Sequence, residues 1–588
     1  AQRVYVLGFE QSLLAVTVDG ARQPGTTWHH AGNILVDPSF LKRVEVEAGA
    51  AAADAGFAAA VGAVRYETVN AYDLLQPGQN AGGRVRLGYG SNGAGVTTNL
   101  STYGKNGMVD WLVMGARQNG SNYKDGRGIE LQGSAPKLTS GLAKLGLQQP
   151  EGHRYELTVE QTRDDALRTK KMNLGLEGGA EPEVFPLKLV RSTATLRYTT
   201  TQATKAYDPE VVLWYNNSDM ERPNALPNSN GGDFAATNKS WGFKAQNVLS
   251  VDAGKITVGV DSSWTDTDVE RYDTTGRPGT TNYYQQGLIR EDAEQHGLYA
   301  QARLRYGSLG ISGGLRYDHH AMDLQDGKNV SDGGWSGNTT LSYLLSDNVE
   351  AYAAASRTFL GYQPGQIGYY HARDYVTAAN YQTSSSQNRK LGVNFFGDQW
   401  KAGIAYFNTR LLDPTEFIHN RTAPGDRTNG QSITSKGWLL NAQYSWKHTT
   451  VGMNATLVDV TQGTPNVFQP GMGDAQPVGN TASLFVDHQI PAWNTRLGAT
   501  LRYAAKTDFT QAALDAGFVN QASYSVVDVS AQWNPQGRKD LTLRLGIDNL
   551  FDRNYYYRGS YPLTTARGGI QAIPAAGRSV QFSGTWSF

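Results

Sequence analysis

Two adjacent histidines near the start of the chain have the clearest capacity for ligand chemistry. Trp28, His29 and His30 follow a Val-Asp-Gly turn, with Arg22 and Gln23 between the turn and the histidines. Imidazole can ligate a borderline metal or hydrogen-bond a carboxylate-rich chelate, and indole offers a stacking face. We interpret all five residues as ligand-binding candidates. Metal ligation by His29 and His30 is the narrower hypothesis, and the structural alternative is that one histidine only ties this segment to its surroundings.

A second histidine pair ends a stretch with strand periodicity. Residues 314–318 read Gly-Leu-Arg-Tyr-Asp and are followed by His319 and His320. Because successive side chains of a strand point to opposite faces, His319 shares the apolar face, while His320 points the other way with Asp318 and Met322. Only His320 of this pair can therefore face an interior ligand. The structural alternative is a wall histidine hydrogen-bonded to Asp318.

Tyrosine and arginine gather in two long polar segments. Together they give aromatic surface and hydrogen-bond donors, the combination needed to capture an anionic metal chelate. Tyrosines also form interfacial girdles in membrane barrels, so only the tyrosines in loops are candidates. The candidates are Tyr283, Tyr284 and Arg290 in one segment, and Tyr362, Tyr369, Tyr370, His371 and Arg373 in the other.

No arrangement typical of a catalytic site occurs in the sequence. There is no P-loop, no Gly-x-Ser-x-Gly, no His-Glu-x-x-His and no cysteine. The 53 basic and 53 acidic residues give a net charge of zero, which argues against charge-driven binding to nucleic acid. We therefore predict a ligand-recognising protein that is not an enzyme and has no intrinsic cofactor.

Period-two alternation runs from about residue 82 to the end of the chain, as half-exposed strands require. Residues 298–306 place apolar side chains at even positions, and the phase resets after Gly307-Ser308, which indicates a hairpin. The longest apolar stretch, residues 48–64, is alanine and glycine interrupted by Asp54, too weakly apolar for a spanning helix. The chain is therefore predicted to be all-β.

Short turns alternate with long polar loops along the chain. The long loops are expected at about residues 264–290, 360–383, 412–431 and 553–572. This alternation gathers the long loops at one end of a closed meander, which is typical of an outer-membrane barrel. Residues 79–588 accommodate about 22 strands at about 23 residues per strand and connection. Residues 1–78 do not alternate in this way, and we expect them to form a compact domain inside the wide lumen.

Three segments resemble the TonB-dependent outer-membrane receptors, in particular the FetA/FrpB-like ferric-siderophore branch. Residues 7–75 are similar to the second half of the family's plug domain, residues 314–318 to a recurring barrel strand, and residues 547–556 to the C-terminal assembly region. The resemblance implies a 22-stranded antiparallel barrel in the bacterial outer membrane, with the C-terminal half of a plug, residues 1–78, in its lumen. It also implies that the Trp28 segment lies at the plug apex and faces the ligand.

The sequence departs from the family pattern in two places. Leu7-Gly8 stands where Arg-Gly is usual, and residues 356–362 read Ser-Arg-Thr-Phe-Leu-Gly-Tyr where Ser-Arg-Gly-Phe-Arg-Ala-Pro is common. The second change affects a ligand-facing loop. The first half of a plug and the TonB box have no counterpart, so we expect the TonB complex to act through an N-terminal segment that precedes residue 1.

The resemblance implies TonB-dependent active uptake of a metal–metallophore complex, with a ferric siderophore as the first choice. A zinc, nickel or cobalt complex is the second, because imidazoles suit these metals; the histidines expected near the outer half are His29, His30, His319, His320, His371 and His419. Heme is the third: His371 lies in the loop where heme receptors carry an axial ligand, but the residues that flank it do not match the pattern of those receptors. A passive channel or a surface receptor or adhesin is the alternative class. The other expectations are contact with outer-membrane lipid and lipopolysaccharide, no nucleic-acid partner, and a monomeric state.

Overall fold

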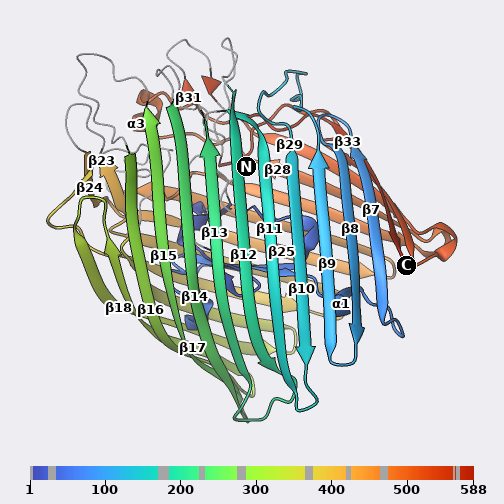
Figure 1. The fold of residues 1–588 in the computed structure, drawn as a ribbon, viewed down its shortest axis with the longest axis horizontal. Coiled ribbons are helices and arrows are strands. Elements are labelled where there is room, and N and C mark those ends of the chain that lie inside the picture. Colours follow the sequence, from blue (N-terminus) through green and yellow to red (C-terminus); the bar gives the residue numbers. More distant parts are fainter. Residues whose placement is uncertain are drawn as a thin grey trace.

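In a computed structural model of the chain, a tall barrel of strands encloses an N-terminal domain (Figure 1). It describes residues 4–23, 35–169, 184–223, 232–273, 287–363, 375–418, 425–463, 474–559, 563–564, 570–571 and 573–588. Within these ranges, 22 strands pair as one closed antiparallel sheet. This confirms the predicted fold class.

The barrel strands follow one another around the sheet in chain order, and β33 closes the sheet against β7. Their bounds are β7 (Ala81–Gly90), β8 (Gly95–Asn106), β9 (Val109–Asn119), β10 (Lys137–Gln148), β11 (His153–Thr169), β12 (Val184–Thr200), β13 (Pro209–Arg222), β14 (Gly232–Val251), β15 (Gly254–Asp273), β16 (Gly287–Tyr306), β17 (Leu309–Asp323), β18 (Asn329–Ser346), β19 (Val349–Gly361), β21 (Ser384–Phe396), β22 (Trp400–Leu412), β25 (Ile433–Trp446), β26 (Thr449–Gln462), β27 (Thr481–Ile490), β28 (Thr495–Ala504), β29 (Tyr524–Trp533), β30 (Leu541–Asp548) and β33 (Ser579–Ser587).

The two ends of the barrel differ as the sequence predicted. The hairpin from β16 to β17 turns at Gly307-Ser308, at the same end as the other short turns. The opposite end, uppermost in Figure 1, carries most of the long connections and the small elements within them. These elements are β20 (Tyr375–Thr377), β23 (Thr415–Ile418), β24 (Gly425–Asn429), α3 (Gln511–Asp515), β31 (Leu563–Thr564) and β32 (Ile570–Gln571). The short-turn end carries η4 (Pro491–Trp493) and η5 (Pro535–Gly537).

One predicted loop is shorter than expected. Strand β15 continues to Asp273 and β16 begins at Gly287, so the boundaries predicted at residues 264 and 290 are wrong. Residues 265–268 read Thr-Asp-Thr-Asp, polar on both faces of the strand. A strand that projects beyond the bilayer needs no apolar outer face, so its alternation disappears although its pairing continues.

The barrel wall is apolar outside and polar inside. On β11, Leu157 and Val159 are about half exposed on the outer face, whereas Thr158 and Glu160 between them are buried on the lumen side. This is the period-two arrangement of a strand with lipid on one face and a polar interior on the other. The buried inner positions are the ones available to hold the N-terminal domain.

The N-terminal domain, called the plug below, contains a four-stranded sheet within the described residues, in the order β4-β3-β6-β5. The elements of the plug are β1 (Tyr5–Val6), β2 (Phe9–Glu10), η1 (Gln11–Leu13), β3 (Ala15–Val18), β4 (Ala21–Arg22), η2 (Pro38–Phe40), β5 (Leu41–Ala48), η3 (Ala53–Ala55), β6 (Gly62–Thr68) and α1 (Ala71–Leu74). Asp19, in the turn between β3 and β4, accepts hydrogen bonds from the N–H (2.8 Å) and hydroxyl (2.5 Å) of Thr68. Among the described residues, no helix is long and apolar enough to cross a membrane.

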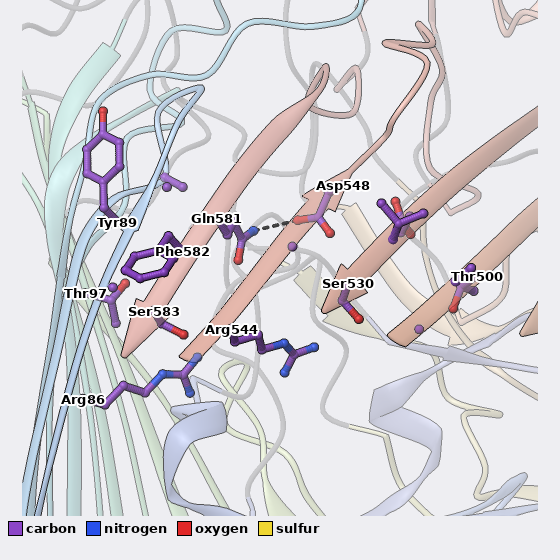
Figure 2. A pocket seen from close by; sticks show the side chains of 18 of the residues that line it. Arg86, Tyr89, Thr97, Thr500, Ser530, Arg544, Asp548, Gln581, Phe582 and Ser583 are labelled. Atoms are coloured by element: carbon purple, nitrogen blue, oxygen red, sulfur yellow. Dashed lines mark hydrogen bonds between the residues drawn. The ribbon is translucent and has the colours of Figure 1, made fainter. Parts of the chain in front are cut away.

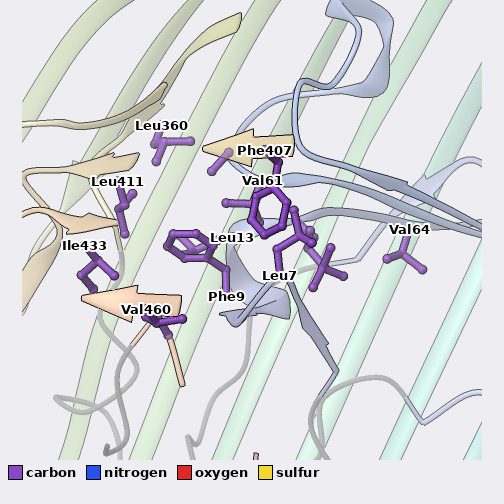
Figure 3. Close-up of a cluster of buried hydrophobic side chains, with 14 of the residues drawn as sticks. Leu7, Phe9, Leu13, Val61, Val64, Leu360, Phe407, Leu411, Ile433 and Val460 are labelled. Atoms are coloured by element: carbon purple, nitrogen blue, oxygen red, sulfur yellow. The ribbon is translucent and has the colours of Figure 1, made fainter. Parts of the chain in front are cut away.

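An apolar cluster fixes one side of the plug to the wall. Phe9, Leu13 and Val61 of the plug are fully buried (Figure 3). The wall contributes residues of β19, β22, β25 and β26 to the same cluster, namely Leu360, Phe407, Leu411, Ile433 and Val460. Burial of this apolar surface favours docking of the plug, since each buried side chain of this size contributes roughly 1.5–3 kcal/mol.

We expect Phe9→Ala to weaken the docking of the plug. Phe9 is 0% exposed, and removing a buried phenyl ring costs about 3–5 kcal/mol. Hydrogen exchange of plug peptides across a urea series would measure this as a lower free energy of plug opening. Val44→Ala is the control, because Val44 is 47% exposed in the same domain. Equal effects of the two substitutions would contradict the role assigned to the cluster.

Candidate functional site

The described part of the candidate site consists of residues that flank the two segments carrying the candidate histidines. Of the predicted ligand-binding residues, the structure describes Arg22, Gln23, Arg290, His320 and Tyr362. The others lie outside the described residues: Trp28, His29, His30, Tyr283, Tyr284, Tyr369, Tyr370, His371 and Arg373. His419 lies outside them as well. Residues on both sides of segment 24–34 and of segment 364–374 are described.

Arg191 of β12 holds both ends of segment 24–34. Its Nη1 donates to Oε1 of Gln23 (3.2 Å), and its Nε donates to the carbonyl oxygen of Leu35 (2.9 Å). Its Nη2 donates to Oε1 of Glu160 on β11 at 2.5 Å, and both charged side chains are buried. One wall guanidinium therefore brings together the residues that precede and follow the segment with Trp28, His29 and His30.

Arg22 is a partly buried cation at the edge of the plug. Its guanidinium lies 4.9 Å from the centroid of the Phe57 ring, a distance typical of a cation–π contact. Burial lowers the pKa of Arg22 to about 10, against the opposing attraction of Asp261. The side chain is therefore still protonated at neutral pH. The adjacent Gln23 donates from Nε2 to Oδ1 of Asn216 on β13 at 3.2 Å.

A charge network in the wall faces Arg22. Arg316 of β17 forms a bidentate pair with Asp261 of β15, with both N–O distances 2.6 Å, and also binds Asp318. Gln295 of β16 donates to both carboxylates, at 3.0 and 2.8 Å. Both carboxylates thus accept hydrogen bonds from residues of the wall. Asp318 pairs with Arg316 and not with the neighbouring His320.

His320 faces the lumen, as its strand phase predicted, and it touches the plug. The side chain is 5% exposed, and its ring centroid lies 5.2 Å from that of Phe57. Its Nδ1 accepts a hydrogen bond from the N–H of Tyr362 at 3.1 Å. That bond requires an unprotonated Nδ1, which places the ring proton of neutral His320 on Nε2. The imidazole ring therefore contacts Phe57 of the plug and also the backbone of Tyr362.

Tyr362 begins the loop that leads to segment 364–374. Its ring stacks on His320 at 6.4 Å and packs against Tyr381 at 5.5 Å. The pairing of β19 with β21 shifts between Phe359 and Gly361, as at a β-bulge, and the intervening Leu360 joins the apolar plug cluster. The stretch that departs from the family pattern thus anchors the loop to both the plug and the wall.

Arg290 is not brought together with the other candidates. It lies on the outer face of β16, beside the exposed Leu288, and forms a bidentate pair with Asp268 at 2.7 and 3.0 Å. The ligand prediction rested on the wrong boundary of the preceding loop. Because β16 begins at Gly287, the pleat directs Arg290 away from the lumen.

Sequence reasoning missed the residues that organise the site, including Phe57, Glu160, Arg191 and Asn216. Phe57 sits in an alanine- and glycine-rich stretch whose fold depends on distant partners. The other three are inward polar residues of ordinary strands. Similar residues recur on nearly every barrel strand, so the only available signal was a charged or amide side chain at an inward position.

A polar cavity of about 590 Å³ lies at another part of the wall (Figure 2). Arg86 of β7, Arg544 and Asp548 of β30, and Gln581 of β33 contribute to its lining. Gln581 donates to Oδ2 of Asp548 at 2.6 Å. None of the predicted ligand residues that the structure describes lines this cavity. In the described part of the chain, no cluster of three or more histidine, aspartate or glutamate side chains could hold a metal ion.

Two family models match the chain. The model described as TonB dependent receptor-like, beta-barrel matches residues 117–550. The model described as TonB-dependent Receptor Plug Domain matches residues 1–63. The first match covers most of the barrel strands, and the second covers most of the enclosed domain.

Curated relatives match along the whole chain. The protein named heme transporter BhuA of Brucella abortus (strain 2308) is 41% identical over 591 residues, which cover 100% of this chain and 86% of the relative. The hemin receptor of Yersinia pestis is 23% identical, and the match covers 99% of this chain and 84% of the relative. Among solved structures, the FrpB iron transporter from Neisseria meningitidis (F5-1 variant) superposes with a TM-score of 0.85 at 20% identity, covering 99% of this chain and 94% of that one. At that identity the superposition supports the fold alone.

We expect Arg191→Met to loosen both ends of segment 24–34. The substitution removes the donors to Gln23 and Leu35 and leaves the Glu160 carboxylate buried without its cation, a change that costs about 3–5 kcal/mol. Hydrogen exchange of residues 18–23 and 35–40 would report it as lost protection. Adding Glu160→Gln removes the stranded charge, so the double variant should recover part of the stability but not the two hydrogen bonds. Unchanged exchange in Arg191→Met would contradict the assignment.

Proposed function

The chain belongs to the TonB-dependent receptor family, and we propose that this outer-membrane protein takes up heme. The observation that carries the proposal is the full-length match, at 41% identity, to a protein named as a heme transporter. Heme was the third choice from the sequence, and the relative moves it to first. The match to FrpB concerns the fold at 20% identity and does not favour an iron siderophore.

The chemistry of the two segments agrees with heme as cargo. Heme iron is commonly held by histidine, and its porphyrin offers a large aromatic face with two carboxylates. Segment 24–34 carries His29, His30 and Trp28, and segment 364–374 carries His371 with Arg373. Histidine would supply an axial ligand, tryptophan a stacking face and arginine a partner for a propionate. His371 also lies in the loop where heme receptors carry an axial ligand, although the residues that flank it do not match the pattern of those receptors.

Uptake requires work on the plug, because a packed domain does not pass a molecule of this size by diffusion. The apolar cluster around Phe9 and the hydrogen bonds from Arg191 hold the plug on two parts of the wall. In this family the energy comes from the TonB complex. The role of this chain is to bind the cargo outside and to let the plug move when it is pulled.

Heme binding by the purified protein in detergent tests the proposal. We expect wild-type protein to bind ferric heme with a shift of the Soret band. Both His371→Ala and the double variant His29→Ala/His30→Ala should weaken binding by at least about tenfold, which corresponds to 1.4 kcal/mol. His448→Ala, in the short turn between β25 and β26, is the control and should bind like the wild type.

A panel of ferric siderophores and of zinc, nickel and cobalt chelates provides the opposing outcome. The heme proposal fails if one of these chelates binds more tightly than heme, or if the histidine variants bind heme as well as His448→Ala does. Binding of no metal complex at all would favour a surface receptor or adhesin.

A further inference from the structure

We propose that His320 is a positioning residue that joins Phe57 of the plug to Tyr362, the residue at the base of segment 364–374, and so holds these two parts of the chain in a fixed relation. The role of His320 in uptake rests on the proposed function, whereas its contacts with the plug and the loop do not. His320 lies on β17, the plug contact comes from the stretch between η3 and β6, and the loop contact comes from the end of β19. One buried ring on β17 thus contacts two other parts of the chain.

The plug side of this connection consists of two tilted rings and a cation. His320 lies 5.2 Å from Phe57, measured between ring centroids, and the Arg22 guanidinium lies 4.9 Å from the Phe57 centroid. Phe57 is 5% exposed. Arg22 is followed directly by Gln23, the residue that Arg191 holds at the start of segment 24–34. The position of Phe57 therefore links His320 to the base of the first segment.

The loop side is fitted closely around the imidazole. Gly361 has a φ of +66°, and a Cβ atom built on it would lie 2.5 Å from Nδ1 of His320. Both the conformation and the space require glycine there. The next residue, Tyr362, donates its N–H to Nδ1 and stacks its ring on the imidazole. The chain thus enters the second segment at a point set by His320.

The contacts assign His320 two separable tasks. The ring packs on Phe57 and Tyr362, and Nδ1 accepts the Tyr362 N–H. In His320→Asn, Oδ1 is the same number of bonds from Cα as Nδ1, so the acceptor is kept and the ring is lost. In His320→Phe the ring is kept and the acceptor is lost. A histidine that ligated the cargo iron would tolerate neither change, whereas a positioning histidine loses a different contact in each.

Hydrogen exchange without any ligand is the first measurement. The N–H of Tyr362 should be protected in the wild type, exchange at least about tenfold faster in His320→Phe, and stay close to wild type in His320→Asn. His319→Phe is the matched control, since His319 lies on the opposite face of the same strand and should leave the amide protected. Wild-type protection of Tyr362 in His320→Phe would overturn the proposal. If His320→Phe does not fold, exposure of this amide in His320→Asn would overturn it.

Heme titration of the same variants is the second measurement. We expect His320→Phe to bind heme more weakly by about tenfold, with the Soret band of the complex at the wild-type position, because the ligands to iron are unchanged. A displaced band in either His320 variant would mean that His320 is itself a ligand and would overturn the positioning role. If wild-type protein binds no heme, the proposed function fails, while the exchange data still decide whether His320 sets the base of the loop.

Discussion

A barrel of 22 strands has a lumen too wide for its own side chains to fill, and the rest of the structure depends on that constraint. Inward residues such as Asn388 and Ser435 are polar and buried, so they need partners that the opposite wall cannot reach. The plug supplies them, because Asn388 donates to the carbonyl oxygen of Ala60 and Ser435 to that of Leu7. Its sheet is small, and its apolar cluster around Phe9 continues into the wall. The plug and the barrel are therefore one packed unit.

The contacts between plug and wall are of two kinds, which respond differently to a pulling force. The apolar cluster around Phe9 is non-directional, so its residues can slide before they separate. On the other side, the wall charge of Arg191 is neutralised within the wall by Glu160. The described part of the plug offers Arg191 neutral oxygen atoms, those of Gln23 and Leu35, so moving the plug there breaks hydrogen bonds but strands no wall charge. Arg316 differs, because it has two carboxylate partners, Asp261 and Asp318, and their excess negative charge attracts Arg22 of the plug.

Among the described residues, two ion pairs cross between plug and wall and set a limit to that freedom. Arg303 of β16 binds Asp54 of η3 with two N–O distances of 2.8 Å. Lys144 of β10 lies 3.2 Å from Asp19, and both side chains are largely buried. Separating the two leaves Lys144 with Glu156 of β11, 3.7 Å away, but leaves the Asp19 carboxylate without its cation unless water follows the plug. Movement of this part of the plug therefore requires hydration of the lumen at the same time.

The sequence predicted most of the fold, because a strand between lipid and a polar lumen must alternate at every step. Prediction failed where that requirement ends: at Arg290, beyond the bilayer, the alternation disappears and the loop boundary was misplaced. For the site, strand phase correctly directed His320 inward, but could not show that its partners are Phe57 and Tyr362, distant in sequence. Arg191 escaped notice because an inward arginine is ordinary in such a wall. Its importance comes from meeting both Gln23 and Leu35, a fact of tertiary structure alone.

The same pairings explain how a wide vestibule can present a defined site. Bringing two chain segments together costs entropy that grows with the length of chain between fixed points. Arg191 holds Gln23 and Leu35, which flank segment 24–34, and His320 holds Tyr362, which lies just before segment 364–374, so the chain is fixed close to both segments. A cargo that binds between segments whose flanking residues are already fixed needs to order less of the chain. The entropic cost of binding is then lower, and the affinity is higher. Because Phe57 touches the residue that fixes the loop, displacement of the plug would disturb that arrangement. Loss of affinity would then follow from the movement that opens the path.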